Sequence, residues 1–182
     1  MIKTIKTENI ILQPAWLEGN NRSDELAAAI HEAGDFELYF GIPESKLFLD
    51  MLSFARPMFY NILNKDGNFV GYIGFHQEDT DHEFEIYILA PYRRQGYAKE
   101  VLSAAIKAAF DGNIDGMNEC ERIVASVRVE NTASHALMKS IGFAENKEIA
   151  FCMQVFLDKP KENNRPIQLK YYYITQEMFT GK

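Results

Sequence analysis

The chain has 182 residues, 47% of them hydrophobic, and carries a formal net charge of −7 at pH 7. This length and apolar content suit one domain with a substantial core, so we assign residues 1–182 to a single domain. The negative charge argues against nucleic acid as the main partner, because nonspecific nucleic-acid binding depends on basic surfaces. No apolar run approaches a membrane span and the N-terminus has no secretory apolar segment, so we expect a cytoplasmic protein without a membrane partner.

The residues that commonly bind metals or form disulfides show no typical spacing. Cys120 and Cys152 are the two cysteines, and the four histidines form no recognisable ligand group. We therefore expect no metal and interpret both thiols as unpaired. The acidic surface is compatible with steering of a cationic amine substrate, and ordinary solubility explains the same charge equally well.

The first half of the chain carries local patterns for short strands and one helix. In chain order, the patterns predict a strand over 10–12, a helix over 23–31 and a β-hairpin with strands over 58–63 and 69–75. The hairpin turn is Asn64-Lys65-Asp66-Gly67, a sequence typical of tight turns.

The next segment joins a strand to a helix through a basic turn that contains glycine. After a polar stretch over 76–81, residues 84–89 read as a strand, and apolar residues recur at helical spacing over 98–109. The turn between them is Arg93-Arg94-Gln95-Gly96-Tyr97-Ala98. A helix N-terminus presents unpaired N–H groups and a positive dipole end, and Gly96 has no side chain to hold an anion away. The junction therefore predicts a pyrophosphate site.

A second strand and helix follow, and two further strands complete the chain. Residues 123–129 alternate as in a strand, Asn131 stands at an N-cap position, and a short helix ends at Gly142, where a left-handed residue is favoured. Two β-rich runs, 149–157 and 167–174, lie near the C-terminus.

These segments together resemble the GNAT N-acetyltransferase superfamily. Its acetyl-CoA signature is Arg or Gln, two residues of any type, Gly, any residue, then Gly or Ala, and Arg93, Gly96 and Ala98 occupy those places. Strand, Asn131, short helix and Gly142-Phe143 are similar to the family's second conserved segment. The resemblance implies an α/β fold, a single domain with a mixed, strongly twisted sheet flanked by helices, in the order β-α-α-β-β-β-α-β-α-β-β.

The resemblance implies acetyl-CoA as the cofactor and direct transfer of its acetyl group to a primary amine. The implied cofactor-binding residues belong to the strand end, the turn and the second helix start: Ile88, Leu89, Arg93, Arg94, Gln95, Gly96, Tyr97, Ala98, Lys99, Asn131 and Ser134. In the family, the Asn and a residue one turn later contact the pantetheine arm. Three alternatives stay open: Asn131 acts only as an N-cap, Ser134 only packs, and Arg93-Arg94 is a solvated pair.

Glutamates on the strand before the signature are the candidate bases. Glu83, Glu85 and Tyr87 share one strand face by period two and are our predicted catalytic residues, because some family members use a strand glutamate near the place of Glu83. A solvated sheet face is the alternative reading of these glutamates. His76 and His82 are alternative bases.

The proton donor for the leaving thiolate and the polarising N–H are less well defined by the sequence. The family usually supplies the N–H where this strand parts from its neighbour, here near Tyr87 to Leu89, and many members place a Tyr four residues before the Gly-Phe glycine. This chain has Met138 there, which cannot donate a proton. Tyr87 and Tyr97 are the remaining candidate acids.

The acceptor is a small-molecule amine or a peptide N-terminus, and the protein is expected to be a monomer or homodimer. The Ser134 pattern and the N-terminal TENIILQPAW somewhat resemble the subgroup that acetylates protein N-termini, including those of ribosomal proteins, although Gln13 replaces its usual Arg. A noncatalytic acyl-CoA sensor is the alternative from another class, favoured by the missing Tyr. The absence of the Lys-Ser/Thr pair argues against a third reading, a nucleotide-phosphate binder with a P-loop.

Overall fold

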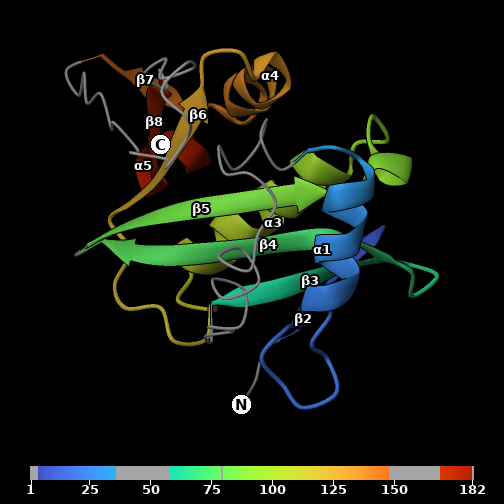
Figure 1. Ribbon diagram of the computed structural model, residues 1–182. Coiled ribbons are helices and arrows are strands. Elements are labelled where there is room, and N and C mark those ends of the chain that lie inside the picture. Colours follow the sequence, from blue (N-terminus) through green and yellow to red (C-terminus); the bar gives the residue numbers. More distant parts are fainter. Residues whose placement is uncertain (1–3, 36–57, 79, 148–168, 182) are drawn as a thin grey trace.

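In the part of the chain that the structure describes, eight strands form one mixed sheet, in the order β1-β2-β3-β4-β5-β6-β8-β7 (Figure 1). The computed structural model describes residues 4–35, 58–78, 80–147 and 169–181. The strands are β1 (Ile5–Lys6), β2 (Ile10–Pro14), β3 (Phe59–Asn64), β4 (Phe69–Glu78), β5 (Asp81–Ile88), β6 (Arg122–Arg128), β7 (Ala144–Asn146) and β8 (Leu169–Thr175). The helices are α1 (Ser23–Glu32), α3 (Tyr97–Phe110), α4 (Thr132–Ile141) and α5 (Gln176–Thr180), with a 3₁₀ turn, η2 (Ala90–Tyr92). The predicted α/β class with a mixed sheet is confirmed.

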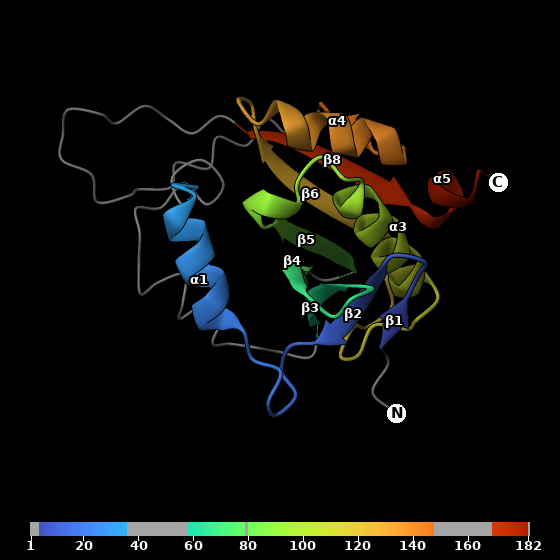
Figure 2. The same cartoon turned by 90° about the vertical axis from the view of Figure 1, so that its right-hand side faces the viewer.

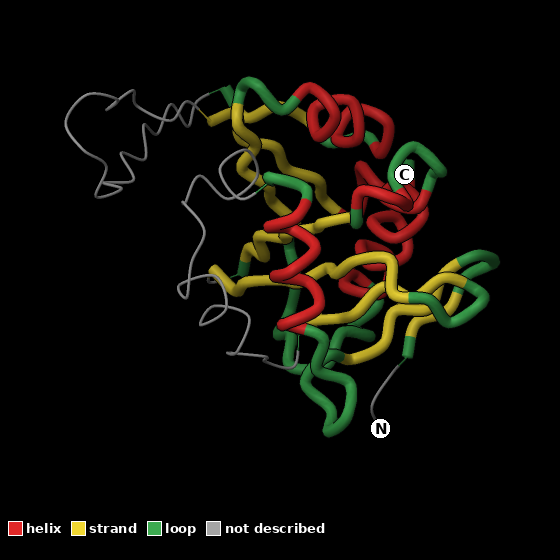
Figure 3. The backbone as a smooth tube through the Cα atoms, turned by 45° about the vertical axis from the view of Figure 1, so that its right-hand side comes forward, coloured by secondary structure: helices red, strands yellow, loops and turns green. Residues whose placement is uncertain are grey.

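Helices cover the two faces of the sheet unequally. Figure 2 shows α1 on one side and α3 and α4 on the other, and Figure 3 shows α1 lying across the near face. The smaller cluster packs Leu26 and Ile30 of α1 against Tyr72 and Tyr87 of the sheet. The larger cluster contains the buried face of α3, including Leu102. A sheet with both faces covered explains why all six residues of β3 are buried.

The β3–β4 hairpin forms where its turn sequence predicts it. The Asn64 side chain accepts hydrogen bonds from the N–H groups of Asp66 and Asn68, at 3.0 and 2.9 Å. Gly67 has a φ of 82°, which a side chain would oppose. This turn therefore owes its shape to two residue types that are visible in the sequence.

Strands β5 and β6 pair in parallel over only a short distance. The pairs are Asp81 with Arg122, His82 with Ile123 and Glu83 with Val124. Beyond them no β5–β6 pairing continues, and Figure 1 shows β6 leaving the direction of β5. The opening between the two strands therefore begins at Glu83.

The sequence prediction differs from the structure at several element boundaries. The polar stretch 76–81, which lies outside the strands predicted from the sequence, mostly belongs to them: β4 continues to Glu78 and β5 begins at Asp81, because these residues pair with one another. The predicted strand over 10–12 corresponds to β2, the short β1 before it was not predicted, and the last predicted strand corresponds to β8. β7 and α5 were not predicted. The expected second helix before residue 58 and the expected strand over 149–157 lie outside the described residues.

The close approach of β4 and β5 at Gly71 gives a test of the fold. A Cβ on Gly71 would lie 2.0 Å from the carbonyl oxygen of Tyr87, and φ there is +155°. We expect Gly71→Ala to lower the free energy of unfolding by about 3 kcal/mol, because backbone must move to admit the methyl group. Gly67→Ala is the control, since open space surrounds that position and only the φ strain of about 1 kcal/mol applies. Urea denaturation measures both, and equal losses would contradict the close approach.

Candidate active site

A pocket of about 580 Å³ lies where the end of β5, the turn before α3 and the helix α4 come together. Its lining residues are Ile86, Tyr87, Ile88, Tyr92, Arg93, Arg94, Gly96, Tyr97, Ala98, Lys99, Ala133, Ser134 and Leu137. Ile86 and Ile88 also pack against the α3 cluster, so the pocket opens on the α3 and α4 face of the sheet. The two segments singled out in the sequence therefore meet at one cavity.

The turn before α3 has the backbone shape of an anion site. Arg94 and Gly96 have φ values of 61° and 87°, and Tyr97 is the first helical residue. The first N–H groups of a helix have no intrahelical acceptor, and left-handed residues in such a turn direct successive N–H groups toward one point. No protein atom lies within 4 Å of a Cβ built on Gly96, so space for a ligand exists there. The turn fits a pyrophosphate.

The first turn of α3 is fixed by the N-terminal hairpin. The Glu100 carboxylate accepts hydrogen bonds from the N–H and side-chain amide of Asn9, at 3.0 and 3.2 Å, and from the Thr7 hydroxyl. Partial burial raises the pKa of Glu100, but these hydrogen bonds outweigh it and leave the pKa below its ordinary value. Glu100 is therefore held as a carboxylate that connects the β1–β2 turn to the helix start.

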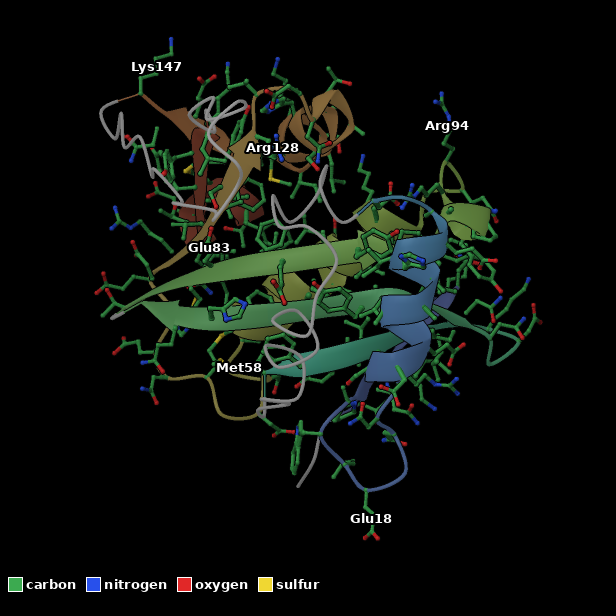
Figure 4. The ribbon with its side chains drawn as sticks, viewed as in Figure 1. Glu18, Met58, Glu83, Arg94, Arg128 and Lys147 are labelled. Atoms are coloured by element: carbon green, nitrogen blue, oxygen red, sulfur yellow. The ribbon has the colours of Figure 1, made fainter. Side chains whose placement is uncertain are left out.

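Two positively charged side chains accompany the turn. Arg94 and Lys99 line the pocket and are exposed, and Figure 4 shows Arg94 extending from the turn into solvent. The N–H of Lys99 itself donates to the carbonyl of Gly96 at 3.1 Å. Lys99 is thus available to an anion through its ammonium group rather than through its backbone.

Some residues assigned to the cofactor from the sequence lie elsewhere. The N–H of Leu89 donates to the carbonyl of Val70 at 2.8 Å, and its side chain packs in the α1 cluster. Gln95 is exposed, and its side-chain amide donates to the carbonyl of Pro91 at 3.0 Å. Neither lines the pocket, because each already completes the strand-to-helix connection.

The start of α4 supplies the opposite wall of the pocket. The side-chain oxygen of Asn131 accepts the N–H of Ser134 at 3.1 Å, so Asn131 is the N-cap. Ser134 lines the pocket with Ala133 and Leu137, whereas Asn131 does not. Ala133 and Leu137 were not predicted from the sequence, although Leu137 lies three residues after Ser134 and four after Ala133, the spacing of one helix face. Ile86 and Tyr92 were also missed, and period two from Ile88 indicates Ile86.

Arg93, the first residue of the signature, is bound to protein groups. Its Nε donates to the carbonyl of Ile88 at 2.9 Å, and its terminal nitrogen forms an ion pair with the carboxylate of Asp35. The guanidinium carbon lies 5.1 Å from the centre of the Tyr87 ring. The solvated-pair alternative therefore does not describe Arg93.

Glu83 lies at the point where β5 and β6 separate, as Figure 4 shows. Its carboxylate accepts the backbone N–H of Ser126 at 3.2 Å and also the Ser126 hydroxyl. Tyr87 lies four residues further along β5, on the same strand face as Glu83, and packs in the smaller cluster with Leu26 and Ile30 of α1. Glu83 therefore belongs to the α1 face, and its carboxylate binds β6 where the two strands separate.

Glu85 lies on the same face in a more crowded position. Its Oε2 is 3.4 Å from Nε2 of His76, and Gly74 is its partner across the β4–β5 pair. The ring of Phe59 covers Gly74. Burial, and next the charge of Glu85, raise the pKa of the Tyr72 hydroxyl well above its ordinary value. Glu85 and Glu83 thus lie on the same face of β5, but the Glu85 carboxylate has the His76 and Phe59 rings beside it.

The other candidate proton-transfer groups are enclosed. Tyr87 is 2% exposed and donates its hydroxyl to Asp35 at 2.6 Å. Burial, and next that hydrogen bond, raise the pKa of Tyr87 well above its ordinary value, so its proton is held in the native state. His82 is fully buried, and Met138 is 2% exposed. Tyr87, Tyr92 and Tyr97 all line the pocket, but the hydroxyl of Tyr87, a predicted acid, is directed to Asp35.

The described residues hold no other reactive centre of the expected kinds. Burial, and next Asp81, raise the pKa of the Cys120 thiol to about 11, so it is protonated at neutral pH. Cys152 lies outside the described part. In that part no three His, Cys, Asp or Glu residues are grouped as metal ligands. Within the same ranges, no helix has both the length and the apolar character needed to cross a membrane.

Comparisons with known proteins agree with this architecture. The sequence profile described as an acetyltransferase (GNAT) domain matches residues 19–144. A GNAT-family acetyltransferase from Bacillus anthracis superposes with a TM-score of 0.69 at 21% identity, covering 96% of this chain and 99% of the other. Spermidine N-acetyltransferase from Vibrio cholerae, solved with CoA and spermine, has a TM-score of 0.71 at 18% identity, covering 94% and 98%. A candidate ribosomal-protein-serine acetyltransferase from Vibrio cholerae has a TM-score of 0.64 at 18% identity, covering 95% and 97%.

These comparisons establish the family. At such low identities the structural likenesses show the fold alone, and no curated protein is significantly similar to the sequence. The domain profile covers more than half of the chain. The chain belongs to the GNAT acetyltransferase family, whose members use acetyl-CoA, and it is an N-acetyltransferase.

The turn before α3 gives the first test of this site. Gly96→Glu would place bulk and negative charge where the pyrophosphate is expected, so we expect acetyl-CoA affinity to fall more than tenfold, about 1.4 kcal/mol or more. Isothermal titration calorimetry measures the change. Gly112→Glu is the matched control, because Gly112 also has a left-handed φ, of 66°, and open space, at the other end of α3. Equal affinities of the two variants would remove the pyrophosphate assignment.

Asn131 gives the second test. Its oxygen caps α4, and Asn131→Asp keeps that oxygen while removing the amide donor. If the amide also contacts pantetheine, Asn131→Asp should retain thermal stability and bind acetyl-CoA more weakly. Asn131→Ala is the comparison variant, because it should also lose about 1 kcal/mol of folding stability with the cap. Wild-type affinity in folded Asn131→Asp would leave only the capping role.

Proposed function

We propose that this protein transfers the acetyl group of acetyl-CoA directly to a primary amine, with Glu83 as the general base. The observation that carries this proposal is the opening between β5 and β6. The pocket lies on the α3 and α4 face, Glu83 lies on the α1 face, and β5–β6 pairing ends between them, after Glu83. A donor and an acceptor could therefore meet through the sheet without sharing a binding surface.

The pocket residues would hold acetyl-CoA by its phosphates and its pantetheine arm. The N–H groups of Gly96, Tyr97 and Ala98 and the charges of Arg94 and Lys99 fit the phosphates. The wall formed by Ala133, Ser134 and Leu137 offers apolar contact and one hydroxyl to the arm. Once bound, acetyl-CoA supplies an activated thioester carbonyl to the amine.

The strand opening also provides backbone donors. Beyond Glu83, the β5 edge that faces β6 has no paired strand, so its N–H groups on that edge point into the opening. An N–H in such a position stabilises negative charge that develops on a carbonyl oxygen. Leu89 is not this donor because its N–H is bound to Val70 of β4. N–H groups alternate between the two edges of a strand, so Tyr87 also faces β4 and the predicted stretch is restricted to Ile88.

Glu83 is favoured over Glu85 as the base because of where its carboxylate lies. Glu83 is held at the start of the opening by two donors from Ser126, which leaves its second oxygen available to an amine or a bridging water. Glu85 is paired with His76 and lies over Gly74 and its covering ring. The protonated Cys120 thiol lies outside the pocket, which favours direct transfer over an acetyl-enzyme among the described residues.

The acceptor is proposed to be a cationic primary amine, either a small molecule or a polypeptide N-terminus. Two carboxylates on the α1 face, Glu83 and Glu85, favour an ammonium group there. The fold is shared with spermidine N-acetyltransferase and with a candidate ribosomal-protein-serine acetyltransferase, which represent the two acceptor types. A thiol-release assay with polyamines, aminoglycosides and peptide N-termini separates them.

Replacement of the base provides the central test. Glu83→Gln keeps the shape and the contact with Ser126 but cannot accept a proton, so kcat should fall by roughly 10² to 10⁴ while acetyl-CoA affinity is unchanged. Wild-type turnover should rise with pH through one ionisation and then level, because only a deprotonated base is active. Glu85→Gln is the matched control and should retain most activity. If Glu85→Gln alone is inactive, Glu85 rather than Glu83 is the general base. A wild-type protein that binds acetyl-CoA tightly but acetylates no amine would support the sensor alternative.

A further inference from the structure

We propose that Asp35 is a positioning residue that sets the geometry of the pyrophosphate turn through Arg93. This inference rests on the proposed cofactor site and deepens it. Asp35 is distant from the signature in sequence. Its carboxylate nevertheless accepts hydrogen bonds from the Arg93 guanidinium and from the hydroxyl of Tyr87. It contacts neither the pocket nor the strand opening directly.

Asp35 is placed by the end of α1. The helix closes at Ala33, Gly34 adopts a left-handed φ of 68°, and the N–H of Asp35 donates to the carbonyl of Ile30 at 3.1 Å. That pattern of bonds is a helix C-terminal motif in which the residue after glycine returns toward the helix. The residue is 7% exposed, so its charge is desolvated and needs its partners. The end of α1 therefore delivers a buried carboxylate to the sheet.

Arg93 links this carboxylate to the turn and restrains the backbone there. Its Nε binds the carbonyl of Ile88, the last residue of β5, while its terminal nitrogen binds Asp35. The side chain thus spans the 3₁₀ turn Ala90–Tyr92 and fixes the distance between the strand end and residue 93. The Tyr87 ring lies against the guanidinium at 5.1 Å and leaves it little freedom.

The residue that follows needs such support. Arg94 has a φ of 61°, which is the one positive φ at a non-glycine residue in the described ranges. A non-glycine residue in this region costs about 1 kcal/mol, and it persists where neighbouring contacts determine the backbone. Arg93 is fixed on one side of Arg94, and Gly96, the N-cap of α3, lies on the other side. The N–H groups of the turn are therefore held in place for an anion. Asp35 acts on the turn indirectly, through Arg93, from the α1 side of the sheet.

The same contacts assign different roles to the two arginines. Arg93 is a structural brace whose charge is neutralised by Asp35, whereas Arg94 extends toward solvent at the pocket rim. If Arg93 instead served the phosphates, removing Asp35 would release its guanidinium and strengthen binding. The two roles therefore predict opposite effects of one substitution.

The test is calorimetric titration of CoA into Asp35→Asn, Arg93→Lys and the double variant. We expect each single variant to weaken CoA binding at least fivefold, because Asn cannot neutralise the guanidinium and Lys cannot make both contacts of the Arg fork. The double variant should be no weaker than the weaker single variant, because both act through one contact. In the acetylation assay, KM for acetyl-CoA should rise by the same factor, with a much smaller change in kcat.

Two further variants keep the outcome clear. Asp111→Asn removes an exposed ion pair with Lys107 at the far end of α3 and should change neither affinity nor KM. Tyr87→Phe removes one hydrogen bond to Asp35 while keeping the ring, and should weaken CoA binding modestly if Asp35→Asn does not fold. Unchanged or tighter CoA binding by folded Asp35→Asn, or by Tyr87→Phe in its place, would overturn the positioning role. A wild-type protein that binds no CoA would instead overturn the proposed function itself.

Discussion

The separation of β5 from β6 after a few parallel pairs is the constraint on which the site depends. A fully paired sheet would have its backbone groups satisfied and would be closed to any reactant. Here pairing stops at Glu83 and Val124, and the N–H and hydroxyl of Ser126 turn to the Glu83 carboxylate instead. The break thus leaves part of the β5 edge without β6 as a partner and places a fixed acidic group where the strands separate.

The pyrophosphate turn is held from two directions by residues distant in sequence. The β1–β2 turn binds Glu100 in the first turn of α3, and the end of α1 binds Arg93 at the start of the connection. These contacts come from 91 and 58 residues away along the chain. A backbone site for phosphate gains affinity from being preformed, because ordering it on binding would cost conformational entropy. The N-terminal part of the chain therefore serves the cofactor site without lining it.

The chemistry available in the pocket departs from the family pattern at the proton donor. Met138 occupies the usual Tyr position and is buried in the core, and the hydroxyl of Tyr87 is bound to Asp35. Tyr92 and Tyr97 line the pocket, with their rings in edge-to-face contact at 6.3 Å. The aromatic residues at the cavity thus come from β5, η2 and the start of α3 rather than from α4.

The sequence by itself determined those features that depend on local backbone chemistry. Gly96 at a left-handed helix entry, Asn131 at an N-cap and the alternation that places Glu83 beside Tyr87 on one face are all written in neighbouring residues. Only the tertiary structure decided that Arg93 binds Asp35 rather than solvent, and that β5 and β6 part after Glu83. Those outcomes depend on which distant segments pack together, and side-chain partners across the fold leave no periodic signal in the chain.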